Sequence, residues 1–166
     1  MESEGRARVK LLVSIQPGLH LRELQRQIGL SFSSTRYHVD KLAKAGEIDR
    51  VEDKGYSRIY PVGTDSKDRI LLSLVRRKTD HEILLCFLAE RSLTQQRLTE
   101  VTGLSKSTVS EHIATLLELG VVRTRVGGGG GRIFELAEPA KIDGLMSRHP
   151  VLLEKATSSF IDLWDF

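Results

Sequence analysis

The chain repeats itself at an offset of 74 residues. Aligned with itself at that offset, the sequence has 11 identities over the 39 ungapped positions of residues 24–62. In this alignment Gly29 meets Gly103, and His38 meets His112. A long repeat that occurs twice indicates two duplicated small domains, because a solenoid is built from more and shorter units.

Composition supports two small cores rather than one large core. Of the 166 residues, 40% are apolar and 5% are aromatic. A single core of this length ordinarily contains more large rings, whereas small aliphatic helical units need few. The lone cysteine, Cys86, excludes an internal disulfide framework and a cysteine-rich metal site. It lies in an apolar run and is expected to be buried.

Each repeat unit predicts the same order of elements, three helices and then a β-hairpin. The third helix is expected after a tight Gly-Leu-Ser turn, in which Gly29 and Gly103 suit a positive φ and Ser31 and Ser105 are N-caps. This order is the winged helix-turn-helix, so the predicted fold class is mainly α with small β-wings (α+β). The expected second and third helices and hairpin strands are 21–28, 32–45, 47–52 and 58–62 in the first unit, and 95–102, 106–119, 121–126 and 132–136 in the second.

The predicted organisation is two tandem winged helix-turn-helix domains followed by a C-terminal helical tail. The linker is expected to be a helix capped at Asp65, and a capping box from Thr79 to Glu82 is expected to start the next helix. The predicted parts are domain 1 (6–64), the linker helix (65–78), domain 2 (79–138) and the C-terminal amphipathic helices (139–166).

The tail predicts two apolar helices. The first carries Ile142, Leu145 and Met146. The second carries an apolar stripe that either packs on its own domain or forms a homodimer interface, because the stripe exceeds what a small winged helix needs to cover. The stripe consists of Leu152, Leu153, Ala156, Phe160, Leu163 and Trp164.

Two segments carry a resemblance to a known family. Residues 103–122, GLSKSTVSEHIATLLELGVV, closely resemble the helix-turn-helix core of the ArsR/MarR-type transcriptional regulators. Residues 29–48, GLSFSSTRYHVDKLAKAGEI, match more loosely, and the Arg36-Tyr37-His38 run resembles the form common in archaeal regulators. The whole chain looks like the archaeal tandem winged-helix regulators, which implies binding to double-stranded DNA. The metal-sensing members carry Cys or His/Asp ligand sets that are not visible here, so neither a metal nor a cofactor is expected.

The last helix of a helix-turn-helix enters the major groove, and its N-terminal residues reach base edges. Arg36 suits guanine, and Lys106 suits guanine or phosphate. Serine and threonine suit phosphates or either base type, whereas a solvated helix face is the alternative explanation. The expected contacts are Ser33, Ser34, Arg36, Tyr37 and Lys41 in the first unit, and Lys106, Ser107, Thr108 and Ser110 in the second, with Glu111 and Thr115 on the same face.

His38 and His112 occupy the same repeat position. Either residue packs or caps a helix, or it contacts DNA; a metal-binding role is not expected.

The two hairpins, or wings, differ in charge. The first carries Lys54 and Arg58 among several acidic residues. The second carries Arg123, Arg125 and Arg132 around a run of five glycines. These five basic residues of the two wings are expected to contact the flanking DNA. Glycine lets the backbone approach a phosphate closely, although an unconstrained hairpin tip is the alternative. The glycine run is followed by neither a Lys-Ser/Thr pair nor a helix, which excludes a P-loop.

The net charge of +3 is shared unevenly. Residues 1–64 and 65–78 each have a net charge of +3, whereas residues 79–138 have −2 and residues 139–166 have −1. Because neutralised phosphates dominate DNA affinity, we expect the first unit and the linker to supply more of the non-specific binding. The second unit is then the weaker binder or a protein-docking surface.

Two functions are consistent with these patterns. The first is a sequence-specific, DNA-binding transcriptional regulator in the cytoplasm, associated with the nucleoid, that contacts the transcription machinery and forms a homodimer through its C-terminal helix. The alternative is a winged-helix protein-interaction module, such as a chromosome-partitioning adaptor or a basal transcription subunit. An enzyme is not expected, because neither a triad nor a paired-carboxylate or metal constellation is visible. Neither an apolar signal segment nor a membrane-spanning stretch is expected.

Overall fold

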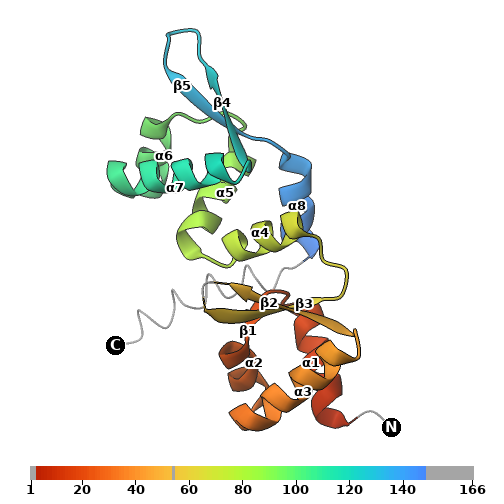
Figure 1. The fold of residues 1–166 in the computed structure, drawn as a ribbon. Coiled ribbons are helices and arrows are strands. Elements are labelled where there is room, and N and C mark those ends of the chain that lie inside the picture. Colours follow the sequence, from red (N-terminus) through yellow and green to blue (C-terminus); the bar gives the residue numbers. More distant parts are fainter. Residues whose placement is uncertain (1–2, 54, 149–166) are drawn as a thin grey trace, which may run out of the picture. The chain divides into compact units, whose positions relative to one another are not determined.

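The computed structural model describes residues 3–53 and 55–148. The chain divides into two compact units, Met1–Leu72 and Ser73–Phe166. Each unit contains three helices followed by a β-hairpin (Figure 1). The predicted fold class, mainly α with small β-wings in two tandem winged helix-turn-helix units, is therefore confirmed.

The three helices of the second unit begin and end 74 residues after those of the first. The first unit contains α1 (Glu4–Ile15), β1 (Leu19–His20), α2 (Leu21–Ile28), α3 (Phe32–Lys44), β2 (Ile48–Asp53) and β3 (Tyr56–Pro61). The second unit contains α5 (Lys78–Ala89), α6 (Gln95–Thr102), α7 (Lys106–Glu118), β4 (Val122–Val126), β5 (Arg132–Leu136) and α8 (Pro139–Arg148). Helix α4 (Ser66–Val75) contains the boundary between the units.

The turn before the third helix is built in the same way in both units. Gly29 and Gly103 end α2 and α6 with φ angles of 74° and 69°, which residues with a Cβ rarely adopt. Ser31 and Ser105 cap α3 and α7, and each Oγ accepts the backbone N–H three residues later, at 3.1 Å and 3.2 Å. These local signals predicted the start of both helices correctly.

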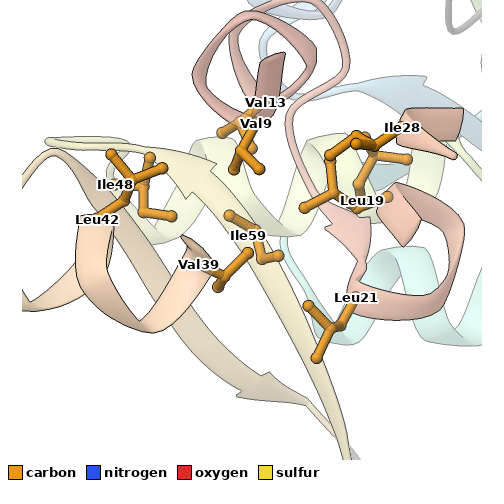
Figure 2. Packing of buried hydrophobic residues seen from close by; sticks show 10 residues of the cluster. Val9, Val13, Leu19, Leu21, Ile28, Val39, Leu42, Ile48 and Ile59 are labelled. Atoms are coloured by element: carbon orange, nitrogen blue, oxygen red, sulfur yellow. The ribbon is translucent and has the colours of Figure 1, made fainter. Parts of the chain in front are cut away.

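The core of the first unit is aliphatic. Side chains of α1, α2 and α3 surround Ile59 of the central strand β3 (Figure 2). Burying each Leu or Ile side chain stabilises the fold by roughly 1.5–3 kcal/mol, so this cluster holds the third helix against the sheet. The cluster consists of Val9, Val13, Leu19, Leu21, Leu24, Ile28, Val39, Leu42, Ile48 and Ile59.

The second unit has a matching set of buried apolar residues, and α8 contributes buried residues of its own. The predicted apolar residues of α8, Ile142, Leu145 and Met146, are all buried. The second predicted tail helix, with its stripe from Leu152 to Trp164, lies outside the described residues. The core of this unit includes Ile83, Leu84, Phe87, Leu93, Leu98, Val109, Ile113, Leu116 and Phe134.

The two hairpins differ in register by one residue. Leu19 of β1 pairs with Ile59 of β3, whereas its repeat partner Leu93 forms a bridge with Phe134 of β5. Phe134 is therefore the structural counterpart of Ile59, although the ungapped sequence alignment pairs Ile59 with Ile133. A shift of one residue turns every side chain of a strand to the opposite face. The sequence repeat thus misaligns the residues of β3 and β5.

The linker differs from its predicted boundaries. Asp65 caps α4 as predicted, because its Oδ1 accepts the backbone N–H of Asp68 at 2.7 Å. The helix ends at Val75 rather than at residue 78, and α5 already begins at Lys78. The capping box predicted from Thr79 is therefore wrong: Thr79 lies inside the first turn.

Candidate nucleic-acid interface

The exposed face of α3 carries the side chains that were predicted to contact DNA. Arg36, Tyr37 and Lys41 are all exposed, and Tyr37 retains 53% of its accessible surface. The opposite face of the helix is buried through Val39 and Leu42. Lys41 Nζ lies 5.6 Å from the centre of the Tyr37 ring, so the helix presents an aromatic ring beside a cation.

Asp40 connects this face to the first wing. Its Oδ1 accepts a hydrogen bond from Arg50 of β2 at 2.5 Å, and its Oδ2 lies 3.8 Å from Nε of Arg36. The side chains of Arg36 and Asp40 are solvated, and an exposed ion pair at this distance contributes little to stability. The guanidinium of Arg36 is therefore available for a stronger anionic partner.

The predicted serine and threonine contacts also serve the helix caps. Ser31 Oγ donates to Oγ of Ser34 at 2.9 Å and lies 3.2 Å from Oγ of Ser33. In the second unit the same network joins Ser105 to Ser107 and Thr108. Each hydroxyl has a second hydrogen-bonding position, so capping and phosphate binding are compatible.

Helix α7 presents a less basic face than α3. Lys106, Ser107 and Ser110 are exposed, whereas Thr108 is half-buried. Within its span α7 has one lysine or arginine and two acidic residues, whereas α3 has three basic residues and one acidic residue. The predicted contacts of the second unit therefore lie on a surface that attracts phosphate less.

The expectation that Arg58 contacts DNA from the first wing needs correction. Its side chain is only 8% exposed, and NH1 donates to the carbonyl oxygen of Gly18 at 3.0 Å. Arg58 thus ties β3 to the loop before β1 inside the first unit. Lys54, the other candidate of this wing, lies outside the described residues.

The arginines of the second wing are exposed to solvent, but each of them contacts another side chain of the wing. Arg125 Nε donates to Oε1 of Glu135, and Arg123 NH2 lies 3.5 Å from Oε2 of the same carboxylate. The hydrogen bonds from Arg125 and Ser92 lower the pKa of Glu135. Glu135 therefore stays ionised and offsets two of the three arginines. The third, Arg132, lies over the ring of Phe134 at 5.3 Å.

The paired histidines pack within their own units. An added Cβ on Gly5 would lie 2.5 Å from Nε2 of His38, so α1 and α3 approach closely there. His112 Nδ1 lies 2.6 Å from Oδ1 of Asp80 on α5, which is 2% exposed. Each ring therefore lies against the first helix of its own unit, and a DNA contact of either ring stays a prediction.

Sequence reasoning missed a group of exposed residues on and around α2. Arg22 and Arg26 line a cleft of about 330 Å³ between α2 and the first wing, together with Phe32 and Tyr56. These residues are far apart in the sequence, and only the fold brings them together. A hint was available in the spacing of Arg22 and Arg26, which places both on one helix face.

None of the helices in residues 3–53 and 55–148 is long and apolar enough to span a membrane. Over the same residues, three or more His, Cys, Asp or Glu side chains nowhere gather into a possible metal site.

Two family models match different parts of the chain. One is described as an N-terminal HTH domain and matches residues 3–72. The other is described as winged helix-turn-helix DNA-binding and matches residues 76–123. The class of the protein follows from these matches: it carries two helix-turn-helix domains, which support a DNA-binding regulator.

Solved structures resemble the chain at low identity. The PcaV transcriptional regulator from Streptomyces coelicolor is 19% identical over 72% of this chain and 74% of that chain, with a TM-score of 0.33. FabT from Streptococcus pneumoniae, solved in complex with DNA, is 12% identical over 72% and 73%, with a TM-score of 0.33. ScpB from Mycobacterium tuberculosis is 17% identical over 83% and 94%, with a TM-score of 0.32. Similarities this low do not identify a function, and none of the curated proteins matches the chain.

Proposed function

We propose that the protein is a sequence-specific transcriptional regulator that binds double-stranded DNA with both recognition helices. Helices α3 and α7 enter the major groove, and the wings contact the flanking DNA. Arg36 and Lys41 are the main base and phosphate contacts of the first unit, and Lys106 is the main cation of the second.

The observation that carries this proposal is the exposed face of α3. A capped turn fixes the start of the helix, and Val39 and Leu42 anchor its inner side in the core. Its outer side presents Arg36, Tyr37 and Lys41 without burying any of them. A rigid helix that projects cations and polar groups from its first turns is the geometry that reads the major groove.

The charge of the first unit adds to this support. Arg22, Arg26 and Lys44 are exposed on α2 and α3 and extend the basic surface beyond the predicted contacts. Because each neutralised phosphate releases counterions, such a surface predicts binding that weakens steeply with salt.

Fluorescence anisotropy with labelled fragments of genomic DNA tests the proposal. With four phosphate contacts, affinity is expected to fall by about a hundredfold between roughly 50 and 200 mM salt. Crosslinking of the protein to the chromosome is expected to yield discrete sites near promoters. Absence of binding to every fragment at low salt would contradict the proposal.

A second candidate, a protein-interaction module, has support in the second unit. Glu135 holds Arg123 and Arg125, and Glu90 accepts a hydrogen bond from Arg97 at 2.7 Å. These pairs neutralise arginines that DNA would otherwise attract. If the second unit docks a protein, removing Lys106 leaves DNA affinity unchanged, which the same anisotropy assay measures.

The proposal extends to assembly and location. The predicted apolar stripe of the tail forms a homodimer interface, and a DNA-bound regulator contacts the transcription machinery in the cytoplasm, at the nucleoid. Sedimentation of the full chain tests the dimer, because Leu153→Asp would break the stripe and yield a monomer.

A further inference from the structure

The cleft between α2 and the first wing, hereafter the α2–wing cleft, combines exposed rings with exposed cations. Phe32 at the start of α3 is 42% exposed, and Tyr56 at the start of β3 is 63% exposed. Large aromatic rings this exposed leave apolar surface in contact with water unless a partner covers it. Both line the same cavity of about 330 Å³, at the lower end of the volumes that small ligands occupy.

The rings are held by contacts with polar side chains. The guanidinium of Arg22 lies 5.4 Å from the centre of the Phe32 ring. The ring of Tyr56 lies 5.3 Å from the ring of His20 and is tilted against it by 55°. Neither ring is inserted in the core, so each keeps a face that a flat group is able to cover.

The charge of the cleft is positive. Arg22 and Arg26 both line it and are exposed. Its acidic residue, Glu23, is engaged at the helix start, where its Oε2 accepts the backbone N–H of His20 at 3.0 Å. A cavity with aromatic faces and two arginines fits a ligand that has both a flat π-system and a phosphate.

The second unit has the same cleft with different chemistry. At the repeat positions of Arg22, Arg26 and Phe32 it carries Gln96, Glu100 and Lys106. Because of the register shift between the hairpins, Gly131 takes the place of Tyr56. The second cleft, of about 620 Å³, is lined by one arginine, Arg132, and one ring, Phe134, so it has neither the paired arginines nor the two rings of the first. The fold that the two units share therefore does not by itself require the paired arginines and exposed rings of the first cleft.

We propose that the α2–wing cleft binds one unstacked nucleotide of a DNA strand. The base stacks on Phe32 and Tyr56, and Arg22 and Arg26 hold the adjacent phosphates. This inference rests on the proposed function, since it uses the DNA that α3 contacts. A paired duplex offers the cleft only phosphates, because its bases are stacked. The first unit therefore prefers DNA that carries an unpaired or extruded base.

The test compares two labelled duplexes that differ at one position, where a 2-aminopurine is paired in one duplex and unpaired in the other. Anisotropy of the full chain is expected to show about tenfold tighter binding to the duplex with the unpaired base, the usual worth of one base stacked on an aromatic ring. The 2-aminopurine fluorescence is expected to fall on binding, because the base stacks on a ring.

Phe32→Ala and Tyr56→Ala are expected to remove most of that preference and to leave binding to the paired duplex within about twofold. Phe32→Tyr keeps an aromatic ring and is expected to retain the preference for the duplex with the unpaired base. Leu11→Ala, which removes an exposed apolar side chain of α1 outside the cleft, is the matched control. Circular dichroism confirms that each variant folds.

Three results would overturn the proposal while leaving the proposed function intact. The first is equal affinity for both duplexes. The second is an equal loss on both duplexes in Phe32→Ala and Tyr56→Ala, which would make the rings ordinary duplex contacts. The third is competition by free adenosine monophosphate without any preference between the duplexes, which would assign the cleft to free nucleotides. Failure to bind either duplex would instead contradict the proposed function itself.

Discussion

The two units share a scaffold and differ on their surfaces. Their helices start and end 74 residues apart, and both turns use the same glycine and serine caps. The outer face of α3 is basic and aromatic, whereas α7 carries a single lysine and the arginines of its wing are paired with Glu135. Duplicated domains thus keep what folding requires, while the exposed positions change freely.

This difference suggests a division of labour. The first unit presents cations and aromatic rings that suit DNA contact. The second unit carries the sequence that more closely resembles a recognition helix, but its surface is more acidic.

The largest expected effect lies in the shared cores. Leu24 and Leu98 occupy the same repeat position and are both fully buried. Leu24→Ala and Leu98→Ala are each expected to lower the free energy of unfolding of their own unit by about 3 kcal/mol. Hydrogen exchange of the amides in each unit measures this loss. A loss below about 1 kcal/mol in one unit would show that the cores are not equivalent.

A smaller effect is expected where the two scaffolds differ. Asp80 on α5 is buried against His112, whereas the matching position of α1 is Arg6, whose Nε has no hydrogen-bond partner among the described residues. Asp80→Ala is expected to lower stability by about 2 kcal/mol, because the imidazole loses its partner. Arg6→Ala is expected to change it by less than about 1 kcal/mol. Thermal unfolding measures the stability of both variants. Equal losses of stability in Asp80→Ala and Arg6→Ala would contradict this account.

Substitutions in the two recognition helices are expected to change DNA affinity by different amounts. Arg36→Ala is expected to weaken binding to a genomic target about tenfold and to relax its base preference, as expected for a lost guanine contact. Lys106→Ala is expected to weaken binding by about threefold. Arg8→Ala, which removes an exposed arginine of α1, controls for net charge. A larger loss for Lys106→Ala than for Arg36→Ala would reverse the assignment.

The smallest expected effect comes from the second wing. Because Arg125 and Ser92 lower the pKa of Glu135, the ion pair persists at neutral pH and is lost only as the pH falls through that lowered pKa. Glu135→Gln is expected to free the arginines, raise DNA affinity about threefold and steepen the salt dependence by about one counterion. Anisotropy over a range of salt concentrations measures both. Unchanged affinity would show that this wing does not approach DNA.

Local signals were sufficient to predict the two recognition helices. The glycine and serine caps fix where α3 and α7 begin, and the apolar stripe through Val39 and Leu42 fixes which face is buried. These features depend only on neighbouring residues, so the sequence repeat transfers them from one unit to the other.

The wings and the cleft depend on distant residues and were not predictable in the same way. The ungapped repeat equated Arg58 with Arg132, but a one-residue shift in hairpin register buries the first and exposes the second. The α2–wing cleft likewise assembles Arg22 and Tyr56 from separate elements. Thr79 failed as a helix start because α5 already begins at Lys78, with Arg77 as its N-cap.

The central claim is that the first unit provides the main DNA contact. A titration of the isotope-labelled full chain with its target duplex, followed by amide NMR shifts, tests it most directly. The account predicts that amides of α3 and of the start of α2 shift at lower DNA concentration than those of α7. Shifts of α7 at low DNA concentration, with α3 and α2 unmoved, would contradict it.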